Sequence, residues 1–183
     1  MQKEEIFLNG PLIFHLDVYK DERGFFMESF QKNRYKAMGI AHSFVQDNVS
    51  QSKKNVIRGL HFQKEPYEQG KLVMVLSGRV WDVAVDIRRN SQTFGKWYGV
   101  ELSSQNHKQF WIPPGFAHGF VALEEDTVFL YKCTAEYQAQ SEGSLRWDDP
   151  DIGIAWPVSN REVRISPKDE TSMSFEEYRK QNI

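Results

Sequence analysis

The sequence predicts an all-β jelly-roll barrel, because it combines two-residue hydrophobic alternation, many short β-rich runs and little helix. The clearest alternation places Trp81, Val83 and Val85 on one face of a strand and Asp82 and Asp86 on the other. Short strands separated by turns, with few helices between them, are typical of sandwiches and barrels rather than of parallel α/β sheets. We therefore expect helices to be short and peripheral.

The expected strands follow one another with short turn sequences between them. They cover residues 44–51, 56–63, 71–76, 81–87, 97–102, 110–112, 119–123 and 128–134. The two-residue connection Ser77-Gly78 is suited to a tight hairpin between the third and fourth strands. Pro113-Pro114-Gly115 and Glu124-Glu125-Asp126 mark later turns.

Two short helices complete the expected elements. The first covers residues 31–38 and stops at Gly39, and the second lies near the C-terminus, where Ser174 and Glu177 have capping-box spacing. With 183 residues, 40% of them apolar, the chain can bury one core but divides poorly into two. We expect a single domain over residues 1–183, with irregular N- and C-terminal arms.

Composition and charge argue against several classes of protein. The formal net charge is −2 and basic residues are scattered, so the one-sided cationic surface of a nucleic-acid-binding protein is not expected. No apolar run approaches membrane-spanning length, and the first residues lack the apolar core of a signal peptide. We therefore expect a soluble cytoplasmic protein without nucleic-acid or membrane partners. The single cysteine, Cys133, excludes an internal disulfide and is expected to be buried.

A polar strand face suggests a pocket inside the barrel. Gln46, Asn48 and Ser50 alternate along one expected strand, although alternation by itself favours the solvent side of an edge strand. Arg58 and His61 follow on the next strand, where strict alternation points them in opposite directions. Both can face one cavity only if the strand contains a bulge, and the intervening Gly59 is consistent with one.

His61 and Lys71 are the first candidates for chemistry. His61 lies between Leu60 and Phe62, where a lone histidine is more often structural than catalytic. Lys71 precedes the apolar run Leu72 to Leu76, where a buried ammonium is costly without an acidic partner or a function. The alternative for Lys71 is a lysine whose charge reaches solvent at the strand end.

A metal site is not expected, and neither is a cofactor. His118, delivered by the Pro-rich turn before it, could join His61, but Gln63 stands where a further ligand would be useful. His15, His42 and His107 have polar neighbours and are expected to be exposed.

Tyr131, Asp148 to Asp151 and Lys168-Asp169 have plain structural interpretations when each is taken alone. Tyr131 alternates with Phe129 and Cys133, so core packing is its simplest role. The Asp-rich segment is most simply a turn, and Lys168-Asp169 follows Ser166-Pro167 in an expected loop.

Taken together, the motifs resemble those of the dTDP-4-dehydrorhamnose 3,5-epimerases over nearly the whole chain. The matching pieces are DERGFFMESF, QDNVSQSKKNVIRGLHFQ, GKLVMVLSGRVWDVAVDIR, FGKWYGVELS, IPPGFAHGF, YKCTAEY and RWDDPDIGIAWP. This family consists of cupin-type jelly-roll homodimers of dTDP-L-rhamnose biosynthesis that work without a metal. The resemblance implies epimerisation of dTDP-4-dehydro-6-deoxy-D-glucose at C3 and C5 through an enolate.

The resemblance also implies catalytic roles for four residues. His61 is implied to be the general base and Tyr131 the acid on the opposite face of the sugar, while Lys71 resembles the electrophile at the C4 carbonyl. Asp169 matches the carboxylate that orients the base. These roles are chemically consistent, since a proton beside a ketone is removed only with a positioned base and a donor for the enolate oxygen.

Further positions match those implied to bind the dTDP-linked 4-keto-6-deoxyhexose. Arg58 is the expected diphosphate contact, because its planar fork fits phosphate oxygens. The other implied binding residues are Arg23, Phe25, Phe26, Glu28, Gln46, Asn48, His118, Tyr137, Glu142 and Lys168. Tyr137 resembles an aromatic that stacks on the base, and part of the N-terminal arm is implied to cross a homodimer, so that two subunits share each site.

Three alternatives remain open at the level of the sequence. Related enzymes that invert only C3 or only C5 share most of these motifs. A non-catalytic cupin that binds a sugar nucleotide is a second alternative, and a metal-dependent dioxygenase or isomerase is a third.

Overall fold

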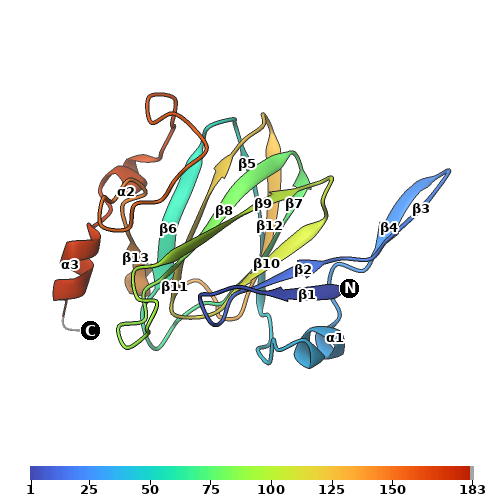
Figure 1. Ribbon diagram of the computed structural model, residues 1–183, viewed down its shortest axis with the longest axis horizontal. Coiled ribbons are helices and arrows are strands. Elements are labelled where there is room, and N and C mark those ends of the chain that lie inside the picture. Colours follow the sequence, from blue (N-terminus) through green and yellow to red (C-terminus); the bar gives the residue numbers. More distant parts are fainter. Residues whose placement is uncertain (182–183) are drawn as a thin grey trace.

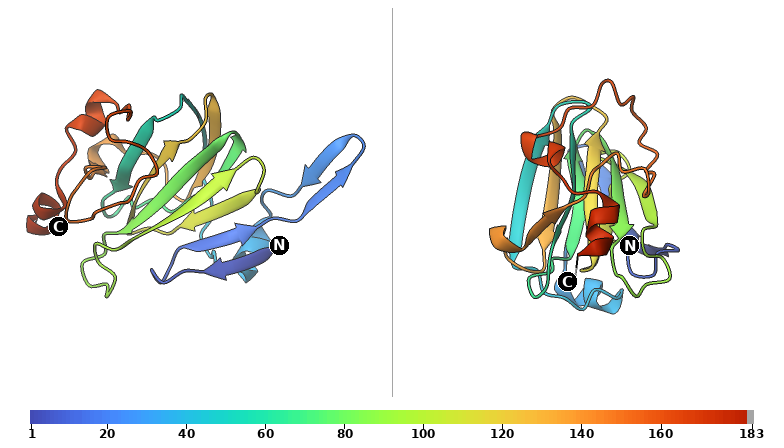
Figure 2. Two further views of the ribbon diagram at one scale, coloured as in Figure 1. Left: turned by 45° about the horizontal axis from the view of Figure 1, so that its top comes forward. Right: turned by 90° about the vertical axis from the view of Figure 1, so that its left-hand side faces the viewer.

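The computed structural model describes residues 1–181, and within that range the strands form two large sheets and one separate hairpin (Figure 1). The strand order is β1-β2-β10-β7-β12-β5 in the six-stranded sheet and β13-β6-β11-β8-β9 in the five-stranded sheet. The two sheets face each other, as the rotated views in Figure 2 show. This arrangement confirms the all-β jelly roll with short peripheral helices that the sequence predicts.

All neighbours in these sheets are antiparallel. The six-stranded sheet contains β1 (Gln2–Glu5), β2 (Leu12–His15), β10 (Lys108–Ile112), β7 (Lys71–Ser77), β12 (Thr127–Cys133) and β5 (Gln46–Ser52). The five-stranded sheet contains β13 (Glu142–Ser144), β6 (Ile57–Gln63), β11 (Phe116–Ala122), β8 (Arg79–Asp86) and β9 (Trp97–Ser103). The eight strands expected from the sequence match β5 to β12, whereas β1, β2 and β13 were not expected.

The main core fills the space between the two sheets. Val73 and Phe110 of the six-stranded sheet pack with Val80, Leu102 and Phe120 of the five-stranded sheet. Burying an apolar side chain of this size contributes about 1.5–3 kcal/mol. Because side chains alternate between the two faces of a strand, polar side chains at inward positions lie inside the barrel rather than on its surface.

The C-terminal segment covers the outer face of the five-stranded sheet. It contains a 3-10 turn, η1 (Ala139–Ser141), and the helices α2 (Pro167–Glu170) and α3 (Phe175–Lys180). Phe175 and Tyr178 of α3 pack on Val83, Val85 and their neighbours. The Ser174–Glu177 capping box expected from the sequence is present. The outward face of β8 is thus covered by protein, so both faces of this strand are buried.

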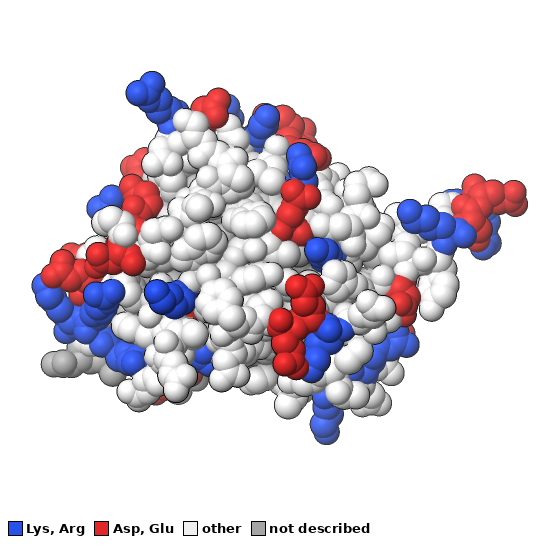
Figure 3. All heavy atoms as spheres, in the orientation of Figure 1, with Lys and Arg blue, Asp and Glu red and all other residues white. Residues whose placement is uncertain are grey.

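The N-terminal part supplies an edge, a helix and an arm. Helix α1 (Lys32–Ala37) begins after its N-cap Gln31. Its Tyr35 packs against Phe14 and Trp111 on the outer face of the six-stranded sheet. The hairpin of β3 (Val18–Asp21) and β4 (Gly24–Met27) projects away from the barrel (Figures 1 and 2). In Figure 3 the projecting tip carries charges of both signs.

Two local expectations are wrong. Ser77-Gly78 does not close a hairpin, because β7 and β8 belong to different sheets; the turn, with Gly78 at φ +82°, carries the chain from one sheet to the other. The expected loop at Lys168-Asp169 is the short helix α2, with Ser166 as N-cap and Pro167 in the first turn. A capping serine followed by proline is a recognisable helix start.

Candidate functional site

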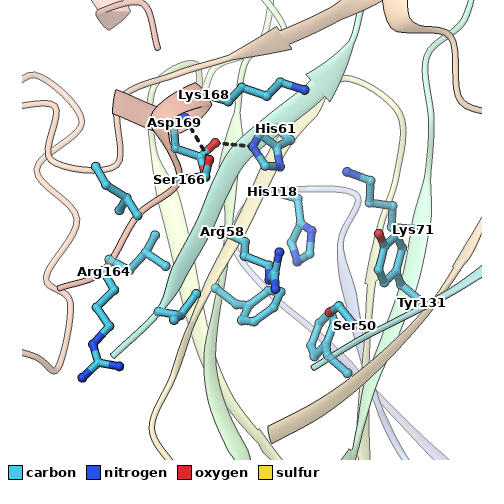
Figure 4. Close-up of a pocket in the computed structure, with 15 residues that line it drawn as sticks. Ser50, Arg58, His61, Lys71, His118, Tyr131, Arg164, Ser166, Lys168 and Asp169 are labelled. Atoms are coloured by element: carbon cyan, nitrogen blue, oxygen red, sulfur yellow. Dashed lines mark hydrogen bonds and ion pairs between the residues drawn. The ribbon is translucent and has the colours of Figure 1, made fainter. Parts of the chain in front are cut away.

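Two adjacent cavities lie in the barrel, and His61, Lys71 and Tyr131 line both of them. The larger has a volume of about 490 Å³, which is in the range of small-molecule sites (Figure 4). Its other lining residues are Ser50, Val56, Ile57, Arg58, His118, Phe120, Phe129, Arg164, Ile165, Ser166, Lys168 and Asp169. The smaller, of about 270 Å³, adds Gln46, Asn48, Phe62, Gln63, Gln69, Tyr137 and Glu142.

His61 is held at the cavity wall by Asp169. Nε2 of His61 donates to Oδ1 of Asp169 at 2.6 Å, and Asp169 is almost completely buried. Because an ionised carboxylate only accepts hydrogen bonds, this contact places the ring hydrogen on Nε2 and leaves Nδ1 of the neutral ring as an acceptor. An imidazole held in one tautomer beside a cavity is suited to remove a proton.

The helix α2 positions Asp169. The preceding segment is tied to β6 because the Ile57 N–H donates to the Arg164 carbonyl at 2.9 Å, and the Ser166 hydroxyl accepts from the Asp169 N–H at 3.1 Å. Burial by itself raises the pKa of Asp169, but the hydrogen bonds from His61, from Ser166 and from the backbone outweigh it and lower the pKa. Asp169 is therefore ionised at neutral pH.

A β-bulge brings Arg58 and His61 to the same cavity, as expected. The register between β6 and β11 shifts between His118 and Phe120, where His118 pairs with His61 but Phe120 pairs with Arg58. The Arg58 guanidinium donates to the Ser52 hydroxyl at 3.0 Å and to the Gln51 carbonyl at 3.0 Å. These contacts hold a planar cation at the mouth of the cavity.

Tyr131 and Lys71 lie across the cavity from His61 (Figure 4). Burial raises the pKa of the Tyr131 hydroxyl, with Cys133 acting in the same direction, so the hydroxyl keeps its proton at neutral pH. Burial lowers the pKa of the Lys71 ammonium, whereas Cys133, Asp82 and Glu142 act to raise it. Tyr131 packs against the main core, as expected, and also lines both cavities, as the partly buried Lys71 does.

His118 forms a second histidine-carboxylate pair. Its Nε2 lies 2.9 Å and 3.0 Å from the two carboxylate oxygens of Asp82. Burial lowers the pKa of His118, and the nearby Asp82 carboxylate opposes that change. Burial raises the pKa of Asp82, and His118 and Lys71 oppose that change. The sequence does not indicate a site role for Asp82, because alternation places it on the face opposite Trp81 and Val83 without showing that this face is the inside of the barrel.

A linked polar cluster borders the smaller cavity. Glu142 accepts hydrogen bonds from the Tyr137 hydroxyl at 2.6 Å and from the Lys168 ammonium at 2.5 Å. The side-chain Oε1 of Gln46 accepts from the Tyr137 backbone N–H at 2.9 Å, and its Nε2 donates to the Asn48 side chain at 3.0 Å. The expected binding residues of β5 and of the C-terminal half thus lie together.

The N-terminal binding candidates do not reach this cavity within one chain. Arg23, Phe25 and Phe26 lie on the projecting hairpin, where both phenylalanines are exposed. The Arg23 guanidinium contacts only its neighbour Asp21 among the described residues, at 2.6 Å. Glu28 forms an ion pair with Arg34 at 3.0 Å.

The sequence does not indicate a site role for some of the lining residues. Arg164 and Ser166 lie on the C-terminal segment, and Phe120 and Phe129 stack at 4.3 Å to form an apolar floor. The Ser50 hydroxyl also lines the cavity and has no hydrogen-bond partner among residues 1–181. Its place on the polar face of β5 was noticed, and this face proves to be the inside of the barrel.

The remaining histidines and Cys133 test the simpler expectations. His42 is exposed and Cys133 is buried, as predicted, whereas His15 is half-buried rather than exposed. The prediction for His107 is wrong, since its side chain is buried and packs 5.0 Å from the Phe25 ring. Within residues 1–181 no group of three or more histidine, cysteine or acidic side chains is arranged to hold a metal ion. None of the helices there has both the length and the apolar composition needed to cross a membrane.

The arrangement can move protons on two sides of a small molecule. An oriented imidazole faces a protonated phenol across the cavity, and an ammonium lies beside the phenol. Such a set can remove a proton next to a carbonyl, stabilise the resulting oxyanion and return a proton from the other side. The arginine and lysine groups at the mouth are suited to an anionic substituent.

Comparison with protein families gives one match that covers most of the chain. The family model described as dTDP-4-dehydrorhamnose 3,5-epimerase matches residues 5–177. A protein of that name from Escherichia coli is 50% identical over 171 residues, which are 93% of this chain and 92% of the relative. One from Methanothermobacter thermautotrophicus is 50% identical over 163 residues, 88% of each chain.

Solved structures agree with the sequence comparisons. The dTDP-4-dehydrorhamnose 3,5-epimerase of Elizabethkingia anophelis superposes with a TM-score of 0.92 at 46% identity, over 97% of each chain. A dTDP-6-deoxy-D-glucose-3,5-epimerase from Legionella pneumophila, solved in complex with dTDP-4-keto-L-rhamnose, gives a TM-score of 0.91 at 50% identity. That match covers 94% of this chain and 92% of the Legionella protein.

Proposed function

The chain belongs to the dTDP-4-dehydrorhamnose 3,5-epimerase family, and we propose that His61 is the base and Tyr131 the acid of its reaction. The enzyme is an isomerase with a cupin-type barrel that converts dTDP-4-dehydro-6-deoxy-D-glucose to dTDP-4-dehydro-L-rhamnose, a step of dTDP-L-rhamnose biosynthesis. The observation that carries the residue assignment is the position of His61 and Tyr131 on opposite sides of one cavity, with Lys71 beside Tyr131.

Proton removal is assigned to His61. The imidazole takes the proton at C5 or C3, and the electron pair of the broken C–H bond moves through the C4 carbonyl to its oxygen, which gives an enolate. Asp169 stabilises the imidazolium formed in this step, because its buried carboxylate accepts the Nε2–H hydrogen bond. Loss of the imidazolium proton to water and reprotonation of the tyrosinate from water restore both groups, so that the same base serves each carbon in turn.

Lys71 is assigned to the enolate oxygen, and Tyr131 to reprotonation. An ammonium inside a cavity of low dielectric stabilises an oxyanion more strongly than it would in water. The Tyr131 hydroxyl then donates its proton to carbon from the face opposite His61, which inverts the centre. Burial raises the pKa of Tyr131, so the donor is protonated when the enolate forms.

The remaining site residues are assigned to substrate binding. We assign Arg58 to the diphosphate, and Gln46, Asn48, His118, Tyr137, Glu142 and Lys168 to the sugar and nucleoside. The support for this assignment is that these side chains line the two adjacent cavities around the proposed catalytic groups. Tyr137 is half exposed at the rim, where an aromatic ring is accessible for stacking on a base.

A homodimer with shared sites is the proposed assembly. The hairpin β3–β4 leaves its own barrel and exposes Tyr19, Phe25 and Phe26, a concentration of aromatic surface that is unusual on a free arm. We propose that Arg23, Phe25, Phe26 and Glu28 complete the nucleotide site of a second copy.

An enzyme that sediments as an active monomer at assay concentration would contradict the proposed homodimer. Mixing Glu28→Gln with His61→Asn under subunit exchange should restore part of the activity.

NMR of dTDP-4-dehydro-6-deoxy-D-glucose with the enzyme in D2O tests the residue roles and the number of centres. Deuterium at both C3 and C5, together with the inverted product, is expected. Deuterium at one carbon only would indicate a single-centre epimerase, and binding without deuterium would indicate a non-catalytic cupin.

Activity should also survive exhaustive chelation, and recovery only after a divalent ion is restored would favour the metal-dependent alternative. The cytoplasmic location expected from the sequence stays a prediction.

A further inference from the structure

The second histidine-carboxylate pair lies deeper in the barrel than His61 and Asp169, and the roles assigned above leave its carboxylate without a function. Asp82 on β8 has an exposed fraction of 0% and contacts Nε2 of His118 through both oxygens, at 2.9 Å and 3.0 Å. His118 pairs in register with His61 on the neighbouring strand. The carboxylate therefore lies one side chain behind the cavity that holds the substrate.

Stability alone is a poor explanation for Asp82. Removing a carboxylate from water costs several kcal/mol, and the partner here is an imidazole, which carries a charge only when protonated. Asp86 lies four residues further along the same strand and has a permanently charged partner. Arg88 donates to it at 2.7 Å, and Ser91 and Thr93 donate as well. A buried ion pair can often be replaced by apolar residues without loss of stability, so a weaker pair suggests another role.

Lys71 is the group that needs a buried negative charge. Its side chain lines both cavities, and the acidic groups that act to raise its pKa are the Cys133 thiol, Asp82 and Glu142. Glu142 already accepts from Lys168 at 2.5 Å and from Tyr137 at 2.6 Å. Burial raises the pKa of Cys133, which keeps the thiol neutral. Asp82 is thus the carboxylate whose charge is not already matched by another lysine.

We propose that Asp82 is a positioning residue of the epimerase. Its carboxylate holds His118 as the Nε2–H tautomer, which leaves Nδ1 as an acceptor on the cavity side, and it supplies the buried negative charge that favours the ammonium form of Lys71. The inference rests on the proposed role of Lys71 as the donor to the enolate oxygen. Without Asp82, Lys71 loses its proton more readily, and a neutral amine stabilises an enolate poorly.

The pH dependence of the reaction should report this coupling. Titratable and charged groups face Lys71 from five strands: His61 on β6, Asp82 on β8, His118 on β11, Tyr131 and Cys133 on β12, and Glu142 on β13. Burial raises the pKa of Tyr131 and of Cys133, so both stay neutral at mildly alkaline pH. The hydrogen bonds from Lys168 and Tyr137 overcome burial and lower the pKa of Glu142, which stays ionised. We therefore assign the loss of activity on the alkaline side to deprotonation of Lys71, whose pKa burial lowers.

The test compares Asp82→Asn with Asp86→Asn in the full-length enzyme. Initial rates of deuterium incorporation into dTDP-4-dehydro-6-deoxy-D-glucose are measured by NMR across the range from weakly acidic to alkaline. We expect Asp82→Asn to lower the rate about 10- to 100-fold, as loss of an orienting partner commonly does, and to move the alkaline limb by about one pH unit or more to lower pH. Asp86→Asn removes an equally buried carboxylate of the same strand and should leave the limb in place.

The outcomes separate this inference from the proposed role of Lys71. A slower Asp82→Asn enzyme with an unmoved alkaline limb shows a merely structural carboxylate and overturns the inference. Lys71→Met supplies the other control: if it is inactive while Asp82→Asn behaves like the parent enzyme, only the role of Asp82 fails. If Lys71→Met keeps full activity, the proposed role of Lys71 fails, and this inference fails with it.

A measurement on the unaltered protein covers the case in which Asp82→Asn does not fold. Nitrogen-15 NMR of the histidine rings distinguishes the two neutral tautomers and the imidazolium, and the His118 signals are assigned by their absence from His118→Gln. We expect His118 to be neutral with its hydrogen on Nε2 near neutral pH. A hydrogen on Nδ1, or an imidazolium, overturns the arrangement in which an ionised Asp82 holds His118.

Discussion

Two histidine-carboxylate pairs face one cavity, and they differ in how far water and substrate reach them. His61 has 31% of its side chain exposed and lies against Asp169, whereas His118 has 8% exposed and lies against a fully buried Asp82. The accessible imidazole can exchange a proton with a bound molecule. The enclosed imidazole is held neutral by burial and serves to present one nitrogen. The same two functional groups thus have different chemistry because their depths differ.

The largest expected effect comes from removing the accessible imidazole. His61→Asn should lower deuterium incorporation at both carbons by about 10³-fold or more, because no other positioned base faces that side of the sugar. His118→Asn is the matched change in the enclosed pair and should weaken substrate binding while measurable exchange persists. Equal loss of exchange in the two variants, measured by NMR in D2O, would show that the pairs do not differ in role.

Tyr131→Phe should separate exchange from inversion. His61 and Lys71 stay in place in this variant, so a proton can leave and return on the original face, while the donor on the opposite face is gone. We expect deuterium incorporation to continue and formation of the inverted product to be largely lost. The assignment of Tyr131 is wrong if Tyr131→Phe stops deuterium incorporation as completely as His61→Asn, or if it inverts both centres at the normal rate.

Asp169→Asn should be more damaging than Asp82→Asn. An asparagine amide can donate to Nε2, which favours the wrong tautomer of His61 and removes the charge that stabilises the imidazolium. We expect kcat to fall about 10²-fold or more, with a smaller change in KM, by steady-state kinetics. A milder effect from Asp169→Asn than from Asp82→Asn would reverse the order of the two pairs.

The two carboxylates should also respond differently to acid. Burial opposes ionisation of Asp169, but hydrogen bonds from His61, from Ser166 and from the backbone leave its pKa lowered on folding. A lowered pKa contributes stability above the unfolded-state pKa of about 4, and this contribution is lost as the pH falls through the folded pKa. Burial raises the pKa of Asp82, so its contribution to stability depends on pH in the opposite direction. Denaturant unfolding should therefore show the deficit of Asp169→Asn relative to the parent enzyme shrinking as the pH falls below 4.

The smallest expected effect concerns α2, the helix that positions Asp169 against His61. Ser166→Ala removes the N-cap of α2 and one hydrogen bond to the backbone of Asp169, which should lower the unfolding free energy by about 1 kcal/mol. Activity should fall only a few-fold, because the contact between Asp169 and His61 persists. Ser174→Ala, at the N-cap of α3 away from the cavity, is the control and should lower stability without changing kcat. Equal changes of kcat in the two variants would contradict a specific role of α2 in positioning Asp169.

Local patterns were sufficient to predict much of the fold. Two-residue alternation located β5 to β12 within a few residues at each end, and the Ser174–Glu177 spacing located α3. The requirement for a bulge between Arg58 and His61 followed from alternation alone and is confirmed by the shifted register. The motifs shared with the epimerase family identified the chemistry, although the roles of the individual site residues stay predictions.

Only the tertiary structure decided which residues meet and how deeply they are buried. Asp169 lies 108 residues from His61 in the chain, and their contact depends on how the C-terminal segment is tied to β6. Alternation places Asp82 on one face of a strand but does not say whether that face meets water or the barrel interior. The same limit explains why Ser77-Gly78 proved to join two sheets and why His107 proved to be buried. Side-chain direction is a local property of the backbone, whereas burial depends on the elements that pack against it.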